Sequence, residues 1–200
     1  MSFRIIVPFK TRAQLTGEAE NFLQKYHPHN TYPIPIEEII EFQLGLDIIP
    51  LPGLHKFFDI DGFLSADRAG ISIDENVYQA RPGRYRFTLA HEIGHFVLHR
   101  ELYGQSDFRN VGDWKRFIES FPEREYSLFE WQAYEFAGHV LVPAHHLEKR
   151  IAYHRKQIRS MRIENEEIVM DRVTELLAQD FVVSREVIHR RIINQIKYGS

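Results

Sequence analysis

The sequence contains no cysteine among its 200 residues. This absence excludes disulfide bonds and zinc sites built on thiolates, and it is typical of proteins from a reducing compartment. The sequence also lacks an apolar run of membrane-spanning length, and its first ten residues carry too short an apolar stretch for a signal peptide. We therefore expect a cytoplasmic protein without membrane contact.

An excess of charge of one sign is also lacking. The formal net charge of −3 gives no general attraction for nucleic acid. The charge is unevenly distributed, because residues 149–200 contain 11 Lys and Arg against 7 Asp and Glu, a net +4, which leaves −7 for residues 1–148. With 44% hydrophobic residues, the chain has the composition of a globular protein and is long enough to bury a core.

Apolar spacing, glycine and proline predict an α+β fold that is mostly helical. Helices are expected over residues 12–26, 36–43, 88–99, 127–141, 143–158, 167–179 and 184–196. Strands are expected at 46–49, 62–66 and 71–73, the last two as a hairpin, with a loop at 81–84 and an irregular surface segment at 100–122. We expect a small N-terminal sheet packed on the helix at 88–99. We divide the chain into a domain of residues 1–148 and a C-terminal helical extension of residues 149–200 that resembles a helix-turn-helix.

The helix expected at 88–99 carries His91-Glu92-x-x-His95. Two histidines four residues apart project from one face of a helix, so both imidazoles can reach one zinc ion. Glu92 lies beside them and can act as the general base of a metallohydrolase. A chance match in a chain with 11 histidines is the competing interpretation, and the segregation of apolar residues onto the opposite face argues against it. His99 can orient a ligand, contact substrate or cap the helix end.

A catalytic zinc ion of this kind needs a third protein ligand. Glu130 is the leading candidate because it falls within the apolar arc of the helix expected at 127–141, where a carboxylate without a partner is costly. Glu135 falls on the opposite side of that helix. An alternative is that Ser127 and Glu130 form a capping box at a helix start. Three further histidines are alternative ligands, but we expect them at the surface: His139, His145 and His146.

These residues resemble the ImmA/IrrE family of bacterial metallopeptidases. The resemblance rests on Arg86-Phe-Thr-Leu-Ala-His-Glu-Ile-Gly-His95, on Glu130-x-x-Ala133-x-x-Phe136-Ala137, and on Val140-Leu-Val-Pro143. It implies a zincin-like fold, metal ligands at His91, His95 and Glu130, and a general base at Glu92. Two residues depart from the family pattern, since Tyr134 stands where asparagine is usual and Val182 where glycine is common.

The resemblance implies a zinc-dependent metallo-endopeptidase, with manganese as the alternative metal. Its expected substrate is a helix-turn-helix transcriptional repressor, whose cleavage regulates genes for stress response or mobile-element transfer. One alternative is a metal-stabilised regulatory or toxin–antitoxin-type module that binds a repressor or antitoxin with little proteolysis. Another is direct DNA binding by residues 167–196, with Ser184 as a helix cap and Arg185, Arg190 and Arg191 at phosphates. The sequence does not indicate an oligomeric state.

Overall fold

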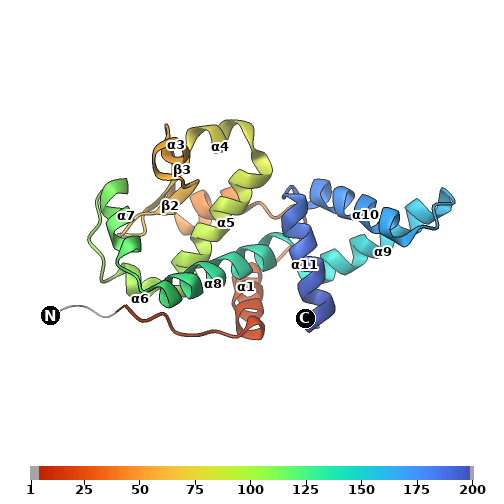
Figure 1. Ribbon diagram of the computed structural model, residues 1–200, viewed down its shortest axis with the longest axis horizontal. Coiled ribbons are helices and arrows are strands. Elements are labelled where there is room, and N and C mark those ends of the chain that lie inside the picture. The colour runs from red at the N-terminus through yellow and green to blue at the C-terminus, as the bar shows by residue number, and fades with distance from the viewer. Residues whose placement is uncertain (1–4, 199–200) are drawn as a thin grey trace.

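The computed structural model describes residues 5–198, which form helices around one three-stranded sheet, and this confirms the predicted α+β class. The sheet lies at one end of the molecule with two short helices, α3 (Leu54–Phe58) and α4 (Glu75–Ala80) (Figure 1). Three helices form the other end: α9 (Ala144–Ser160), α10 (Glu166–Phe181) and α11 (Arg185–Tyr198). Within the described residues, none of the helices has the length and apolar character needed to cross a membrane.

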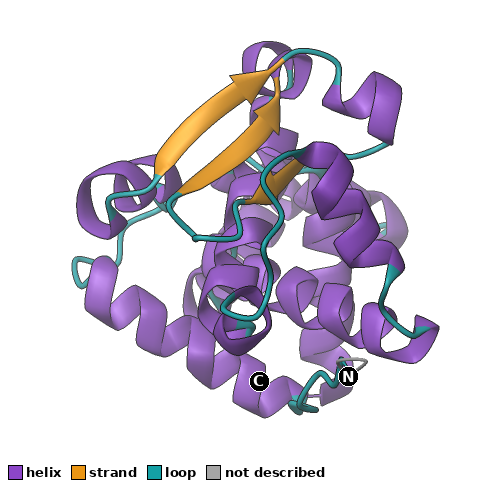
Figure 2. Ribbon diagram, turned by 90° about the vertical axis from the view of Figure 1, so that its left-hand side faces the viewer, coloured by secondary structure: helices purple, strands orange, loops and turns teal. Residues whose placement is uncertain are grey.

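The sheet has the strand order β1-β3-β2 and lies over one side of the helices (Figure 2). β1 (Asp47–Leu51) pairs in parallel with β3 (Gly70–Asp74), and β2 (Gly62–Leu64) pairs with β3 in antiparallel fashion, as the predicted hairpin requires. A Cβ atom at Gly62 would come within 2.7 Å of the Ser72 carbonyl oxygen and 2.9 Å of Thr88 Cγ2. Glycine therefore allows β2 to lie close to both β3 and the helix that carries Thr88.

The first helices follow their sequence signals closely. α1 (Arg12–Tyr26) begins after Thr11, whose side chain forms a capping box with Gln14. The helix expected at 36–43 is a single turn of α-helix, α2 (Ile36–Glu38), continued by the π-helix η1 (Ile39–Leu44). Gly45 ends it with a φ of +66°, a left-handed conformation that glycine adopts without strain.

The loop predicted at 81–84 is wrong, because the motif helix begins earlier than expected. α5 runs from Pro82 to Leu98, with Pro82 in its first turn. Proline is favoured there since its fixed φ suits a helix and its missing N–H would have no helical partner. The extra turns bring Arg84 and Tyr85 into the helix. Arg84 donates a hydrogen bond to Asp61, just before β2, and the Tyr85 hydroxyl donates one to Glu37 of α2.

The surface segment predicted at 100–122 contains two helices, α6 (Arg100–Tyr103) and α7 (Val111–Glu119). Aromatic side chains hold this segment together: the rings of Tyr103, Phe108 and Phe117 contact one another, and Phe121 contacts Phe117. Tyr103 and Phe121 also contact Phe129, which anchors the segment on the helix that carries Phe129. Within the segment, the spacing of these aromatic residues follows no single helical period, because they come from two helices and the loops beside them. Hydrophobic periodicity in the sequence therefore does not indicate these apolar contacts.

α8 runs from Glu123 to Leu141 and begins directly after Pro122. Ser127 lies inside this helix rather than at its start, so the capping-box interpretation of Ser127 and Glu130 is wrong. α5 and α8 pack side by side at the centre of the molecule (Figure 1). A Cβ atom at Gly94 would lie 2.9 Å from Ala133 Cα, which shows that the two backbones approach as closely as side chains allow.

The two final helices, α10 and α11, occur where the sequence predicted them, and Ser184 Oγ accepts a hydrogen bond from Val187 N at the start of α11. Val182 between them has a φ of +52°, which is strained for a β-branched residue and explains why glycine suits this position. The predicted domain boundary after residue 148 falls inside α9, and the division into two domains stays a prediction.

The predicted phosphate contact of Arg191 is wrong, because this side chain is only 3% exposed. Arg191 Nε donates a hydrogen bond to the Val142 carbonyl oxygen at 3.2 Å. Its Nη1 lies 3.2 Å from His139 Nε2, and its aliphatic part packs against Gly138. Arg191 therefore holds α11 against the end of α8.

Candidate metal centre

The motif residues lie in the middle of α5, on the side that faces α8. Leu89 and Ile93 on the same helix are fully buried in the core, which fixes the orientation of the helix. His91 is partly buried, and His95 and Glu92 are 3% and 5% exposed. The polar face of α5 is therefore largely buried rather than exposed at the surface.

The structure brings together side chains from two helices at this point. His91 Nε2 lies 3.0 Å from His95 Nε2, and the two carboxylate oxygens of Glu130 lie 3.3 Å from His91 Nε2 and 3.6 Å from His95 Nε2. Zinc bonds of about 2.0–2.1 Å in a tetrahedral arrangement place donor atoms about 3.3 Å apart. The spacing and the chemistry of these donors therefore fit a single zinc ion with a fourth position left open.

The carboxylate of Glu92 lies beside this cluster. Its Oε2 accepts a hydrogen bond of 2.9 Å from the Leu64 backbone N–H, which fixes the side chain against β2. Burial raises the pKa of Glu92 to about 7, although His91 and the Leu64 N–H oppose the increase. A carboxylate with a pKa near neutrality can both accept and return a proton at physiological pH.

The two histidines differ in their electrostatic environment. Burial lowers the pKa of His91, but its hydrogen bond to Glu130 and the charge of Glu130 outweigh this effect and leave the pKa above its ordinary value. Burial lowers the pKa of His95 well below its ordinary value, and the neighbouring His91 and His99 add to the decrease. His95 is therefore a neutral imidazole at pH 7, the form that binds metal ions.

The cluster opens into a cavity of about 310 Å³ between α5, α7, α8 and the start of β2. Aromatic side chains form much of its wall, including Trp114, Tyr126 and Tyr134. The sequence drew attention to Tyr134 only as a departure from the family pattern, and it gave no indication of Trp114 or Tyr126. Their position beside the motif depends on α7 and on the first turn of α8, which were not predicted.

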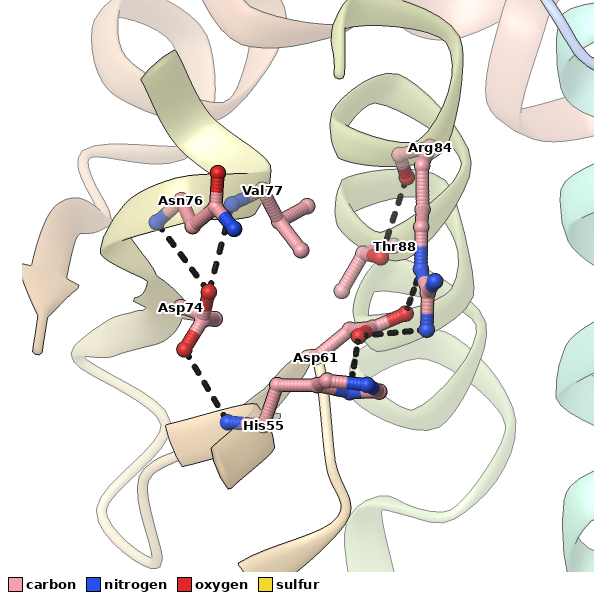
Figure 3. A network of polar contacts seen from close by, with 7 residues as sticks. All are labelled: His55, Asp61, Asp74, Asn76, Val77, Arg84 and Thr88. Atoms are coloured by element: carbon pink, nitrogen blue, oxygen red, sulfur yellow. Dashed lines mark hydrogen bonds and ion pairs between the residues drawn. The ribbon is translucent and has the colours of Figure 1, made fainter. Parts of the chain in front are cut away.

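A polar network fixes the segment that leads into β2 (Figure 3). Arg84 in α5 makes a two-pronged ion pair with Asp61, whose carboxylate also lies 3.1 Å from His55 Nδ1. Burial raises the pKa of the neighbouring Asp74, but hydrogen bonds from the backbone N–H groups of residues 55, 76 and 77 outweigh this and lower it. These contacts hold Asp61 and β2 in place at the wall of the cavity.

The remaining candidate histidines lie away from the cluster. His145 is exposed, and its Nε2 lies 2.7 Å from Asn30 Nδ2, while His146 is partly buried against the Asn30 carbonyl oxygen. The prediction that His139 lies at the surface is wrong, since it is only 5% exposed. The sequence could not show this, because the helix that covers His139 is α11, some fifty residues further along the chain.

Glu135, on the opposite side of α8 from Glu130, contacts other residues. Its carboxylate accepts hydrogen bonds of 3.1 and 3.3 Å from Asn194 Nδ2 and lies 3.4 Å from Arg12 Nε. Among the described residues, the one group of three or more histidines and carboxylates suited to a metal ion is formed by His91, His95 and Glu130.

Comparison with known proteins gives two positive findings. Residues 53–192 match the sequence profile of the peptidase M78 family, described as IrrE N-terminal-like domain. A Mycobacterium tuberculosis transcriptional regulator has a similar fold, with a TM-score of 0.54 and 15% sequence identity over 88% of this chain. The similar region is 46% of the regulator, so this chain spans about half of that protein. No curated protein matches the sequence.

The family match covers well over half of the chain, and it includes both α5 and α8, the helices on which the motif residues and Glu130 lie. The same blocks of sequence carried the resemblance to ImmA/IrrE proteins. The chain therefore belongs to the peptidase M78 family, the proteins with an IrrE N-terminal-like domain.

Proposed function

We propose that the protein is a zinc-dependent endopeptidase that cleaves one specific protein partner, a helix-turn-helix transcriptional repressor, and so regulates gene expression. The observation that carries the proposal is the convergence of His91, His95 and Glu130 from two helices, with the buried carboxylate of Glu92 beside them. The resemblance to ImmA/IrrE proteins supports a repressor as the partner and the cytoplasm as the place of cleavage.

His91, His95 and Glu130 would hold the metal ion through two imidazole nitrogens and one carboxylate. Zinc is the metal that best suits this donor set with one open position, and manganese is the alternative because imidazole and carboxylate also bind it. The bound ion would act as a Lewis acid toward the scissile carbonyl and would acidify a water molecule.

Glu92 would perform the proton transfers of peptide hydrolysis. Its carboxylate takes a proton from the attacking water and later delivers it to the leaving amine. The hydrogen bond from the Leu64 N–H holds Oε2 toward β2, so the other carboxylate oxygen is free for the water. Tight binding of one oxygen reduces the freedom of the side chain and keeps the base in position.

The cavity suits an extended peptide. β2 is an edge strand of the sheet, and Gly62 at its start lines the cavity. An extended segment can add to such an edge through backbone hydrogen bonds, which bind any sequence, while side-chain contacts give specificity. The aromatic side chains Trp114 and Tyr126 provide apolar surface for the residues of the partner next to the cleaved bond.

Two phenol groups are candidates for stabilising the oxyanion. Tyr126 and Tyr134 lie about one helical turn on either side of Glu130, and both line the cavity. Burial raises the pKa of both groups, so each stays protonated and able to donate a hydrogen bond at neutral pH. The ring of Tyr134 is held between Phe87 and Arg190, which makes it the more firmly positioned of the two.

The proposal is tested by incubating zinc-loaded protein with the matched repressor and following cleavage. Glu92→Gln removes the base but keeps the shape of the side chain, so we expect cleavage to fall about 100- to 10,000-fold with unchanged zinc content. Chelation of the metal should also stop cleavage in the wild type. If Glu92→Gln still controls the repressor without cutting it, the protein acts as a binding module instead. If Glu92→Gln cuts as fast as the wild type, the assignment of the base is wrong.

A further inference from the structure

A third histidine lies directly behind the proposed metal ligands. His99 directly follows α5 as its C-cap residue, and it is only 2% exposed. Its Nδ1 lies 3.0 Å from Nδ1 of His95, on the side of the His95 ring that faces away from Glu130. The ring of Phe129 lies against both imidazoles, with centroids 4.0 Å from His95 and 4.4 Å from His99, and restrains their planes.

His99 is connected in turn to a buried amide. Its Nε2 lies 3.2 Å from Oε1 of Gln132 on α8, a residue that is 1% exposed. Gln132 Nε2 donates a hydrogen bond of 2.8 Å to the carbonyl oxygen of Pro8. An unbroken series of hydrogen bonds therefore runs from His95 through His99 and Gln132 to the N-terminal segment.

The chemistry of the last group sets the direction of the whole series. A backbone carbonyl only accepts, so the amide of Gln132 must turn its NH₂ toward Pro8 and its oxygen toward His99. That oxygen also only accepts, so the proton of neutral His99 lies on Nε2 and its Nδ1 has a free lone pair. This lone pair accepts the Nδ1 proton of His95, which leaves Nε2 of His95 unprotonated on the side of Glu130.

The anchor of the series is itself held in place. The N-terminal segment lies along α8, where Val7 N donates a hydrogen bond of 2.6 Å to Glu125 Oε2. Phe9 stacks on Trp131 with 6.4 Å between ring centroids. These two contacts, on either side of Pro8, fix the position of its carbonyl oxygen. Residues more than a hundred positions apart in the sequence are thereby joined to the metal site.

We propose that His99 and Gln132 are positioning residues that use the Pro8 carbonyl as a fixed acceptor to hold His95 with its Nε2 lone pair directed at the metal. This inference rests on the proposed function, because it takes His95 as a metal ligand. Outer partners of this kind raise the affinity of a site for its metal by fixing the tautomer and orientation of the ligating imidazole. Here the outer partner of the ligand is a second neutral histidine, directed by an amide.

The experiment measures zinc affinity of the full chain by competition with a chromophoric chelator. His99→Phe keeps a ring of similar size but has no acceptor, and Gln132→Leu removes the group that directs His99. We expect each variant to bind zinc about 10- to 100-fold more weakly than the wild type. His99→Gln provides a carbonyl acceptor for His95 and an NH₂ donor for Gln132, so it should keep most of the affinity.

A matched control separates positioning from general damage. His139→Phe also removes a buried histidine with polar contacts, to Thr16 and Arg191, but it lies away from the metal site. It should leave zinc affinity unchanged, even if the metal-free protein unfolds at a lower temperature. Equal losses of affinity in His139→Phe and His99→Phe would overturn the proposal, as would a His99→Phe variant that binds zinc like the wild type.

Imidazole nitrogen NMR of the zinc-loaded protein gives a second, independent result. We expect His99 to carry its proton on Nε2, and a proton on Nδ1 of His99 would contradict the proposal. Wild-type protein that binds no zinc would overturn the proposed function together with this inference. Wild-type protein that binds zinc and cuts its partner, with unchanged affinity in His99→Phe, would overturn the inference alone.

Discussion

The two faces of α8 carry similar side chains in different surroundings. On the face toward α5, Glu130 pairs with His91 and His95, at 3.3 and 3.6 Å. On the face toward α11 and the start of α1, Glu135 accepts two hydrogen bonds from Asn194 and lies 3.4 Å from Arg12. A carboxylate beside two imidazoles can still accept a cation, whereas one beside an arginine is already neutralised. The neighbours of the two glutamates, rather than their residue type, distinguish the proposed metal ligand from a structural contact.

Two buried histidines show the same contrast: His95 of α5, which lies against one face of α8, and His139 on the other face of α8. His95 lies beside the carboxylate of Glu130, which favours a positive ion. His139 lies 3.2 Å from Arg191 Nη1, which disfavours one. Both have lowered pKa values, mainly through burial. Burial alone therefore makes a neutral imidazole available, and the charge of the neighbour decides whether a metal ion can join it.

The largest effect is expected where α5 packs tightly on α8, at Gly94. A substitution there should act on the side of α8 that carries Glu130. A Cβ atom at Gly94 would lie 2.9 Å from Ala133 Cα and 3.0 Å from its carbonyl oxygen, both backbone atoms that cannot turn aside. We expect Gly94→Ala to lower the free energy of unfolding by about 1–3 kcal/mol and to weaken zinc binding, because the helices must move apart. Denaturant unfolding and chelator competition measure the two effects.

Gly17→Ala is the matched control for this substitution. Gly17 also lies inside a helix, α1, but a Cβ atom there would meet no atom within 4 Å. It should raise the free energy of unfolding by about 0.5–1 kcal/mol, since alanine is the better helix former. If Gly94→Ala were as stable as the wild type and bound zinc equally well, the tight packing of the two helices would not be what positions the ligands.

A smaller effect on stability is expected from His139, on the opposite face of α8 from Glu130, when the pH is lowered. Burial lowers the pKa of His139 to about 3, and the charges of Arg191 and Arg12 contribute. The unfolded chain takes up a proton at this residue below pH about 6.5, while the folded chain does not, so stability falls as the pH falls. One pH unit below that value, the loss from His139 is about 1 kcal/mol.

His139→Gln keeps a polar side chain next to Arg191 but cannot take up this proton. Unfolding free energies measured between neutral and mildly acidic pH should therefore decrease less steeply in the variant than in the wild type. Identical slopes would show that His139 is not held neutral by the packing of α11 against α8. His91, His95 and Glu130 should not contribute to the difference, because both proteins retain them.

The sequence predicted the parts of the site that depend on local spacing. The separation of His91 and His95 placed both on one face of a helix, and the position of Glu130 within the apolar arc of α8 directed it toward α5, where it is partly buried. The start of α8 was placed four residues too late, at Ser127 instead of Glu123, and this gave rise to the mistaken capping box. Local patterns identify a helix more reliably than they identify its first turn.

The features that were missed depend on contacts between distant segments. His139 was expected at the surface, because nothing in its own helix shows that Arg191 covers it. Gln132 attracted no attention in the sequence, because its role depends on the Pro8 carbonyl, 124 residues earlier. Residues of this kind acquire their function only when the N-terminal segment and α8 meet, and no periodicity within either segment records that contact.

We propose that Glu130, and not Glu135, completes a metal site with His91 and His95. The most direct test is the zinc content and zinc affinity of three purified proteins: the wild type, Glu130→Gln and Glu135→Gln. We predict one zinc ion per chain in the wild type and in Glu135→Gln. In Glu130→Gln the affinity should fall by more than the roughly 10- to 100-fold typical of an outer partner, because a direct ligand is lost. Zinc binding that survives in Glu130→Gln and is lost in Glu135→Gln would contradict the account.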